Sequence, residues 1–205
     1  ASLEEVKLRI TTKAKSLSEA KLLIKPIKEK LHAKFSTYIF GEDNENLPTV
    51  LIKELIKRNE SIVFAESCTG GLLSSQITSV AGSSKVFKGS VIAYSNEIKS
   101  LILNVPKDLL SNYGAVSEEV AESMATGVKN KFNSDWAISV SGIAGPSGAS
   151  ELKPIGLVYI AITGPNNETL KIKKQYNPLR NRNEIQRLSV NDCLNSLRLI
   201  LLSNK

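Results

Sequence analysis

The stretch from Ser61 to Gly71 (SIVFAESCTGG) constrains the fold more than any other part of this sequence. It begins with a short apolar run, Ile62 to Ala65, whose β-branched and aromatic residues are typical of a strand buried on both faces of a parallel sheet. Polar side chains and the pair Gly70-Gly71 follow, and a helical hydrophobic pattern begins at Leu72. The stretch therefore predicts a strand, a tight turn and a helix, the unit from which α/β sheets are built.

The end of this strand predicts half of a binding site. In open α/β sheets, ligands bind at the carboxyl ends of the strands, where a helix N-terminus offers N–H groups and partial positive charge to an anion. Thr69, Gly70 and Gly71 are therefore candidates for binding a phosphate or carboxylate. The competing interpretation is that Ser67 or Thr69 only caps the helix and the glycines only shape the turn. Glu66 could act as a base, or it could cap neighbouring amides.

Two later apolar runs also end in polar residues. Val91–Tyr94 is followed by Ser95-Asn96, and Trp136–Ser141 is followed by the glycine-rich loop Gly142–Gly148. Leu157–Thr163 and Glu168–Gln175 are two further strands, which a Gly-Pro-Asn-Asn turn joins as a hairpin. We expect an α/β fold with a layered mixed sheet and helices on both faces, in which three polar strand ends converge on one cleft.

The first 46 residues predict a smaller unit of α+β type. An alternating pattern in residues 3–13 and the run Thr37–Phe40 each predict a strand. Between them, helical spacing from Ser18 to Leu31 is interrupted by Pro26, which predicts a bend or two short helices. An amphipathic helix then starts at Leu47, so the expected domains are residues 1–46 and 47–205.

Charge and hydropathy limit the classes of partner. The net charge of +7 divides into 12 Lys and Arg against 9 Asp and Glu in residues 1–60, and 15 against 11 in residues 61–205. Because no basic block stands out, a small anionic substrate explains the charge as well as a nucleic acid does, and nucleic acid is not the expected partner. No apolar run approaches the ~20 residues of a membrane span and no signal-peptide pattern is present, which predicts a cytoplasmic protein without membrane contact.

The inventory of metal ligands is small. Two cysteines, Cys68 and Cys193, and a single histidine, His32, cannot supply the ligand set of a structural zinc site, so we expect no metal. His32 lies in the helix of the first unit and is expected at the surface. Cys68 is a candidate nucleophile, because a helix N-terminus lowers the pKa of a thiol. Cysteine is, however, also a common small buried residue.

Six ordered motifs support a family resemblance. They are AESCTGG (65–71), AGSS (81–84), YSNEIK (94–99), GAVS (114–117), SGIAGPSG (141–148) and KPIG (153–156). Together they closely resemble the C-terminal domain of the CinA family, the competence/damage-inducible proteins, over residues 47–205. In that family this domain is a nicotinamide mononucleotide amidohydrolase, which forms nicotinic acid mononucleotide and ammonia without a metal or cofactor.

The first segment is similar to the small KH-like linker domain that precedes the deamidase in full-length CinA. The long form of the family has a further, molybdopterin-binding-like N-terminal domain, so the resemblance implies that this chain is a fragment of a longer one. It also implies a homo-oligomer. A KH unit would bind nucleic acid through a GxxG loop, whereas residues 1–46 contain only Gly41, so nucleic-acid binding by this segment is the weakest hypothesis.

The resemblance assigns roles to individual residues. It implies Ser84 as the nucleophile, Lys99 as its general base, and Tyr94 and Ser67 as residues that orient the substrate or relay the proton. To act as a base near neutral pH, Lys99 would need its pKa lowered by about 3 units, a cost of about 4 kcal/mol. Burial in a cleft and the positive end of its own helix both act in that direction.

Further residues are implied for the nucleotide end of the substrate. Gly142 and Gly145, with the turn at Thr69 to Gly71, are candidates for the phosphate and ribose, and Arg182 matches a family arginine loosely. Gln186 stands where a second arginine is expected. The alternative function is a non-catalytic nucleotide-binding or competence-associated module that keeps the cleft and lacks turnover.

Overall fold

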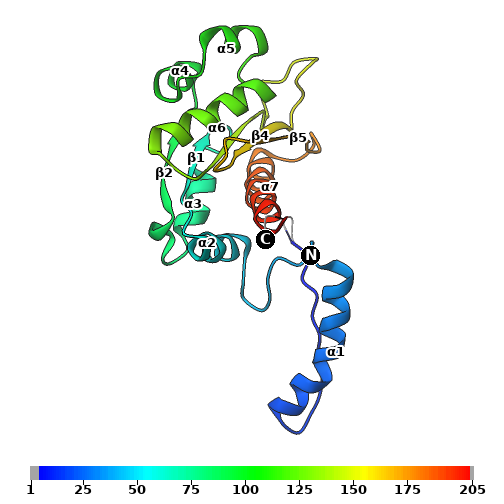
Figure 1. The fold of residues 1–205 in the computed structure, drawn as a ribbon. Helices are drawn as coiled ribbons and strands as arrows, with labels where there is room; N and C mark the ends of the chain where they lie inside the picture. Colours follow the sequence, from blue (N-terminus) through cyan, green and yellow to red (C-terminus); the bar gives the residue numbers. More distant parts are fainter. Residues whose placement is uncertain (1–4, 204–205) are drawn as a thin grey trace.

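A computed structural model describes residues 5–203, and its body is built on one mixed five-stranded sheet (Figure 1). The strand order is β2-β1-β3-β4-β5, with β2, β1 and β3 parallel and β4 and β5 antiparallel to their neighbours. The strands are β1 (Ile62–Glu66), β2 (Phe87–Ile92), β3 (Trp136–Gly142), β4 (Leu157–Thr163) and β5 (Thr169–Gln175). The mixed α/β sheet expected from the sequence is confirmed.

Helices cover both faces of the sheet. One layer contains α2 (Leu47–Arg58), α3 (Leu72–Thr78) and α7 (Arg182–Ser203), and the other contains α4 (Asn96–Leu103), α5 (Lys107–Tyr113) and α6 (Glu118–Phe132). Strand β1 serves both layers, because Ile62 and Phe64 pack in the first core and Val63 and Ala65 in the second. Each fully buried Ile, Val or Phe contributes about 1.5–3 kcal/mol, so this central strand anchors the body.

The predicted hairpin is confirmed by the antiparallel pairing of β4 and β5. Strand β2 differs from its prediction, since it begins at Phe87 and ends at Ile92 rather than covering residues 91–94. It is an edge strand whose residues are only half-buried or exposed, so a search for a continuous apolar run misses its first half. A short 3₁₀ turn, η1 (Ser83–Lys85), leads into it.

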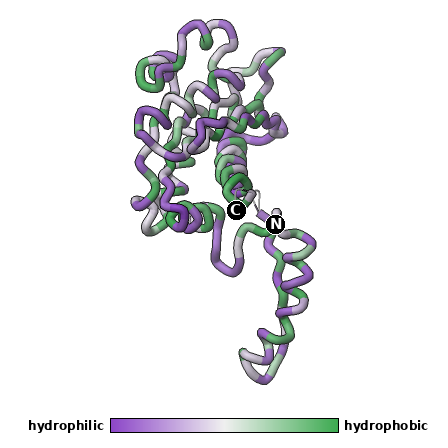
Figure 2. Tube along the Cα trace, viewed as in Figure 1, coloured by the Kyte–Doolittle hydropathy of each residue, from purple (hydrophilic) through white to green (hydrophobic). Residues whose placement is uncertain are grey.

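Residues 5–40 form an arm that projects from the body (Figure 1). Helix α1 (Leu17–Phe35) is capped by Ser16, whose hydroxyl accepts from the Glu19 N–H, and it continues through Pro26 as one helix. In Figure 2, hydrophilic and hydrophobic residues alternate along this helix, and none of its residues is buried.

Both strands predicted for the first unit are wrong within the described residues. Residues 5–13 and Thr37–Phe40 form no strand, and residues 3 and 4 lie outside the described part of the chain. An alternating pattern needs a neighbouring strand and a core to cover, and here Val6 and Leu8 remain 73% and 60% exposed. The described residues therefore show no KH-like domain. We propose the domain boundary between residues 46 and 47, where Asn46 caps α2.

Within residues 5–203, no helix is both long enough and apolar enough to cross a membrane. The part of the molecule that carries the candidate site is the sheet body. The arm is attached to it through the Arg198 guanidinium, which donates to the Thr37 carbonyl at 2.6 Å.

Candidate active site

The candidate site lies where β1 and β2 end. The Ala93 N–H donates to the Glu66 carbonyl at 2.8 Å, which holds the two strand ends together before the chain turns into α4. Ser95 caps this helix by accepting from the Ile98 N–H, and Lys99 lies in its first turn. As a result the Lys99 side chain points back under the strand ends and is only 1% exposed.

The Lys99 ammonium has three oxygen neighbours. Its Nζ lies 3.2 Å from Ser67 Oγ, 2.8 Å from the Ala93 carbonyl and 3.3 Å from the Tyr94 carbonyl. No carboxylate forms an ion pair with it among residues 5–203, and burial lowers the pKa of Lys99 below its usual value. A neutral amine has two N–H groups for the two carbonyls and one lone pair, which then faces the Ser67 hydroxyl.

Ser67 is held in place by β3, which pairs with β1 on the side opposite β2. Its N–H donates to the Val140 carbonyl of β3 at 3.0 Å, and its carbonyl accepts from the Gly70 N–H. The residue is only 8% exposed, and its N–H continues the hydrogen bonding between β1 and β3. The structure therefore brings Ser67 and Lys99 together, as a hydroxyl beside a buried amine.

Glu66 fills the start of α3. Its carboxylate is fully buried and accepts five hydrogen bonds, from the N–H groups of Gly71, Leu73 and Ser74 and from the hydroxyls of Thr69 and Ser74, at 2.5–3.0 Å. The carboxylate thus occupies the place at which an external anion would meet this helix N-terminus.

The geometry matches neither interpretation of the predicted anion site in full, because Glu66, rather than Ser67 or Thr69, accepts from the N–H groups at the start of α3. The Thr69 hydroxyl and the Gly71 N–H both donate to Glu66, so neither is available to a phosphate. Gly70 and Gly71 have positive φ, 60° and 101°, which side-chain-bearing residues rarely adopt. These residues shape the turn that presents Ser67.

A second polar group lies at the rim of the site. Arg182, at the start of α7, donates to the Tyr94 hydroxyl at 3.0 Å and to the Gly145 carbonyl at 3.1 Å. It has no ion pair with a carboxylate in the described part of the chain, so its charge faces only neutral acceptors. Tyr94 is 62% exposed and lies between Lys99 and Arg182. Its carbonyl accepts from Lys99 and its hydroxyl accepts from Arg182.

Gly142 has a structural explanation. A Cβ at this position would lie 2.5 Å from the Val158 side chain and 2.8 Å from the Leu157 carbonyl, so only glycine fits against β4. Gly145, at φ 75°, contributes its carbonyl to Arg182. Of the two loop glycines, only Gly145 thus has a direct contact with a site residue.

Ser84 is not brought to Lys99. It is an exposed residue of η1, before β2 begins, whereas Lys99 follows the end of β2. The six residues of β2, at about 3.3 Å each, separate the two ends by roughly 20 Å. The predicted pair of Ser84 and Lys99 therefore does not form within one chain.

The other candidates are also remote or unreactive. Burial raises the pKa of the Cys68 thiol to about 12, so it stays protonated near neutral pH. His32 lies in the arm, with Nε2 2.8 Å from a Glu42 carboxylate oxygen. No group of three or more His, Cys, Asp or Glu that could hold a metal ion occurs between residues 5 and 203.

Gln186 is a site residue whose role the sequence did not reveal. Its side-chain amide, on α7, donates to the Cys68 carbonyl at 2.7 Å and so ties the turn after Ser67 to this helix. It lies four residues after Arg182, one helical turn along the same face, and this spacing is the signal that pairs the two residues at the site.

The fold and the site define an α/β protein with a Ser-Lys pair at the carboxyl ends of its parallel strands. The family model described as "CinA C-terminal domain" matches residues 44–201, and the chain belongs to the CinA family. A CinA-like protein of Prochlorococcus marinus strain MIT 9215 is 68% identical over 204 residues, and one of strain NATL1A is 48% identical over 201. The matches cover 100% and 98% of this chain but 48% and 46% of the two relatives, so the chain spans about half the length of these curated relatives.

Solved structures share the fold of the body. The competence/damage inducible protein CihA from Agrobacterium tumefaciens aligns with a TM-score of 0.74 and 35% identity, over 80% of this chain and 98% of that one. A CinA superfamily protein from Escherichia coli aligns with a TM-score of 0.72 and 27% identity, over 81% and 98% of the two chains.

Proposed function

We propose that this chain hydrolyses the carboxamide of nicotinamide mononucleotide to nicotinic acid mononucleotide and ammonia, with Ser67 as the nucleophile. The observation that carries this proposal is the 3.2 Å contact between Ser67 Oγ and the buried Nζ of Lys99. We infer the substrate from membership of the CinA family. We assign the nucleophile to Ser67 rather than Ser84 because Ser67 is the serine in contact with Lys99.

Lys99 acts as the general base in this scheme. Its depressed pKa lets part of the protein carry a neutral amine, whose lone pair accepts the Ser67 proton while the Ala93 and Tyr94 carbonyls hold its two N–H groups. Ser67 Oγ then bonds to the carboxamide carbon, and the carbonyl electron pair moves onto oxygen. The N–H of Cys68, next in the chain after the nucleophile, is our candidate donor to that oxyanion.

The same lysine serves the second half of the reaction. The Lys99 ammonium returns its proton to the departing nitrogen, the C–N bond breaks, and ammonia leaves an ester on Ser67. Water, deprotonated by Lys99, hydrolyses this ester to the carboxylate and restores the serine. Lys99 returns this proton to the Ser67 oxygen, and the carboxylic acid that forms loses its own proton to the released ammonia.

Arg182 is the proposed ligand for the phosphate. Within residues 5–203, its guanidinium donates to the neutral Tyr94 hydroxyl and Gly145 carbonyl and forms no ion pair, and it lies at the opposite end of Tyr94 from Lys99. A substrate whose carboxamide reaches Ser67 therefore has an uncompensated cation within reach of its phosphate. The start of α3 has no such role, since Glu66 already occupies it.

The test is release of ammonia and nicotinic acid mononucleotide from nicotinamide mononucleotide, measured by a coupled ammonia assay and by chromatography. Turnover by the wild-type chain, lost in Ser67→Ala, is the expected result. A protein that binds the nucleotide saturably and forms no product between about pH 6 and pH 10 would contradict the proposal and favour the non-catalytic binding module.

A further inference from the structure

Nearly all of the net charge of this protein lies on the arm. Residues 5–40 contain nine Lys and Arg against three Asp and Glu, a net charge of +6, whereas residues 41–205 contain 18 against 16, a net charge of +2. A division at residue 60 hides this, because residues 41–60 are net acidic. The structure places the relevant boundary at the base of the arm, before α2 begins.

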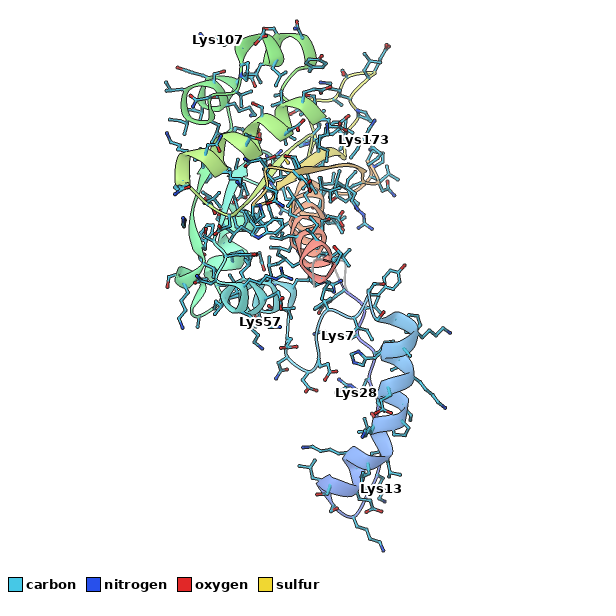
Figure 3. The ribbon with its side chains drawn as sticks, viewed as in Figure 1. Lys7, Lys13, Lys28, Lys57, Lys107 and Lys173 are labelled. Carbon is cyan, nitrogen blue, oxygen red and sulfur yellow. The ribbon has the colours of Figure 1, made fainter. Side chains whose placement is uncertain are left out.

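Most cations of the arm have no acidic partner. Lys7, Lys25 and Lys28 form ion pairs, with Glu5, Glu29 and Glu42. The other six have no carboxylate within ion-pair distance in the described chain, and all are exposed: Arg9, Lys13, Lys15, Lys21, Lys30 and Lys34. Figure 3 shows Lys7, Lys13 and Lys28 spread along the arm, away from the body that carries Lys57, Lys107 and Lys173. Such a concentration of unpaired charge is an electrostatic footprint for a polyanion.

The arrangement of the cations selects the kind of polyanion. Lys21 and Lys30 are nine residues apart in α1, which is about two and a half turns, so they lie on opposite sides of the helix. A helix that lies on an anionic membrane carries its cations on one face and its apolar residues on the other, and a flat bilayer meets only one face. A flexible single strand can wrap and contact both sides, and Tyr38, 81% exposed at the base of the arm, offers a ring for base stacking.

We propose that the arm, residues 5–40, binds single-stranded nucleic acid through its phosphates, without reading base sequence. The contact is electrostatic, so the expected dissociation constant is in the range of about 10⁻⁴–10⁻⁶ M at physiological salt. Neutralising about five phosphates gives a slope near −3.5 for log K against log salt concentration. Binding therefore weakens about 10²-fold between 50 and 200 mM KCl.

The experiment uses the full 205-residue chain and a fluorescein-labelled 20-nucleotide RNA of mixed sequence, followed by fluorescence anisotropy. The arm variant changes Lys13, Lys15, Lys21, Lys30 and Lys34 to Gln, which keeps helix propensity and removes five charges. The matched control changes five exposed body lysines to Gln: Lys57, Lys85, Lys107, Lys131 and Lys173. Circular dichroism and thermal unfolding of both variants establish that each is folded.

We expect the arm variant to lose at least about 30-fold in affinity at 50 mM KCl and most of its salt dependence, and the control to change by less than about 3-fold. Equal losses in the two variants would overturn the proposal, because only net charge would then matter. So would absence of RNA binding at 50 mM KCl, or binding to phosphatidylserine vesicles without binding to RNA. Ammonia release from nicotinamide mononucleotide is measured in parallel, and its presence or absence does not bear on these outcomes.

Discussion

The two ends of the sheet carry serine-rich turns that differ in what surrounds them. At the amino end, Ser61 and Asp135 satisfy each other, since the Ser61 N–H and hydroxyl both donate to Asp135 Oδ2 and the Asp135 N–H donates to Ser61 Oγ. At the carboxyl end, Ser67 lies against a buried amine that has no counter-charge in the described chain. A serine-rich turn therefore gains reactivity only where the topology also delivers a desolvated base.

The largest expected effect separates the two ends directly. Ser67→Ala removes the proposed nucleophile and should lower kcat/KM for nicotinamide mononucleotide by at least about 10³-fold. Ser84→Ala, at the amino end, should stay within about 3-fold of wild type, and Cys68→Ala should do the same because its thiol is protonated. The measurement is steady-state ammonia release by the three purified variants. A loss in Ser84→Ala as large as that in Ser67→Ala would mean that Ser84 reaches the site from another copy of the chain.

The next effect concerns the base. Lys99→Met should lower kcat/KM by about 10²–10⁴-fold, the usual contribution of a positioned base. Because burial lowers the pKa of Lys99 from its ordinary value of 10.5, the neutral amine appears at lower pH than in an exposed lysine. The wild-type rate should rise with pH and level off below the usual lysine range, whereas Lys99→Arg, which keeps the charge, should be inactive throughout. A pH profile in Lys99→Met identical to that of wild type would rule out this role.

The strands show which parts of the fold could be predicted from the sequence. Leu157–Thr163 was predicted with the bounds that the structure gives, because a hydrophobic run bounded by turn residues is local information. The strands expected in residues 3–13 and Thr37–Phe40 failed because pairing depends on a neighbouring strand, which a local pattern does not contain.

The choice between Ser67 and Ser84 illustrates the same limit. Motif resemblance favoured Ser84, although its turn precedes a strand and the turn of Ser67 follows one. Turns that precede and follow parallel strands lie at opposite ends of a sheet, so the order of elements carried the signal that motif matching alone missed. The spacing of Gln186 from Arg182 is visible in the sequence, but its hydrogen bond to the Cys68 carbonyl depends on the path of α7, which the sequence does not give.

The third effect concerns Glu66, the buried carboxylate at the carboxyl end of the sheet. Glu66→Gln replaces an acceptor of five hydrogen bonds with an amide that has only one acceptor oxygen, so buried donors lose their partner. We expect a loss of about 2–3 kcal/mol in the free energy of unfolding, measured by urea titration. Glu54→Gln, which removes a partly exposed ion pair with Arg58, is the control and should cost at most ~1 kcal/mol. Equal losses would show that Glu66 has no special part in holding the turn.

The smallest effect lies at the amino end. Burial alone would raise the pKa of Asp135, but the hydrogen bonds from the Ser61 hydroxyl and N–H hold it below its ordinary value of 3.8. Because the folded-state pKa is depressed, Asp135 stabilises the fold above pH 3.8, and this contribution is lost as the pH falls through the lower folded value. Asp135→Asn should therefore cost about 1 kcal/mol at pH 7 and less below about pH 4, by urea unfolding at both pH values. Ammonia release should be unchanged in this variant, since Asp135 belongs to the end of the sheet opposite Ser67, and a loss of turnover would remove the distinction between the two ends.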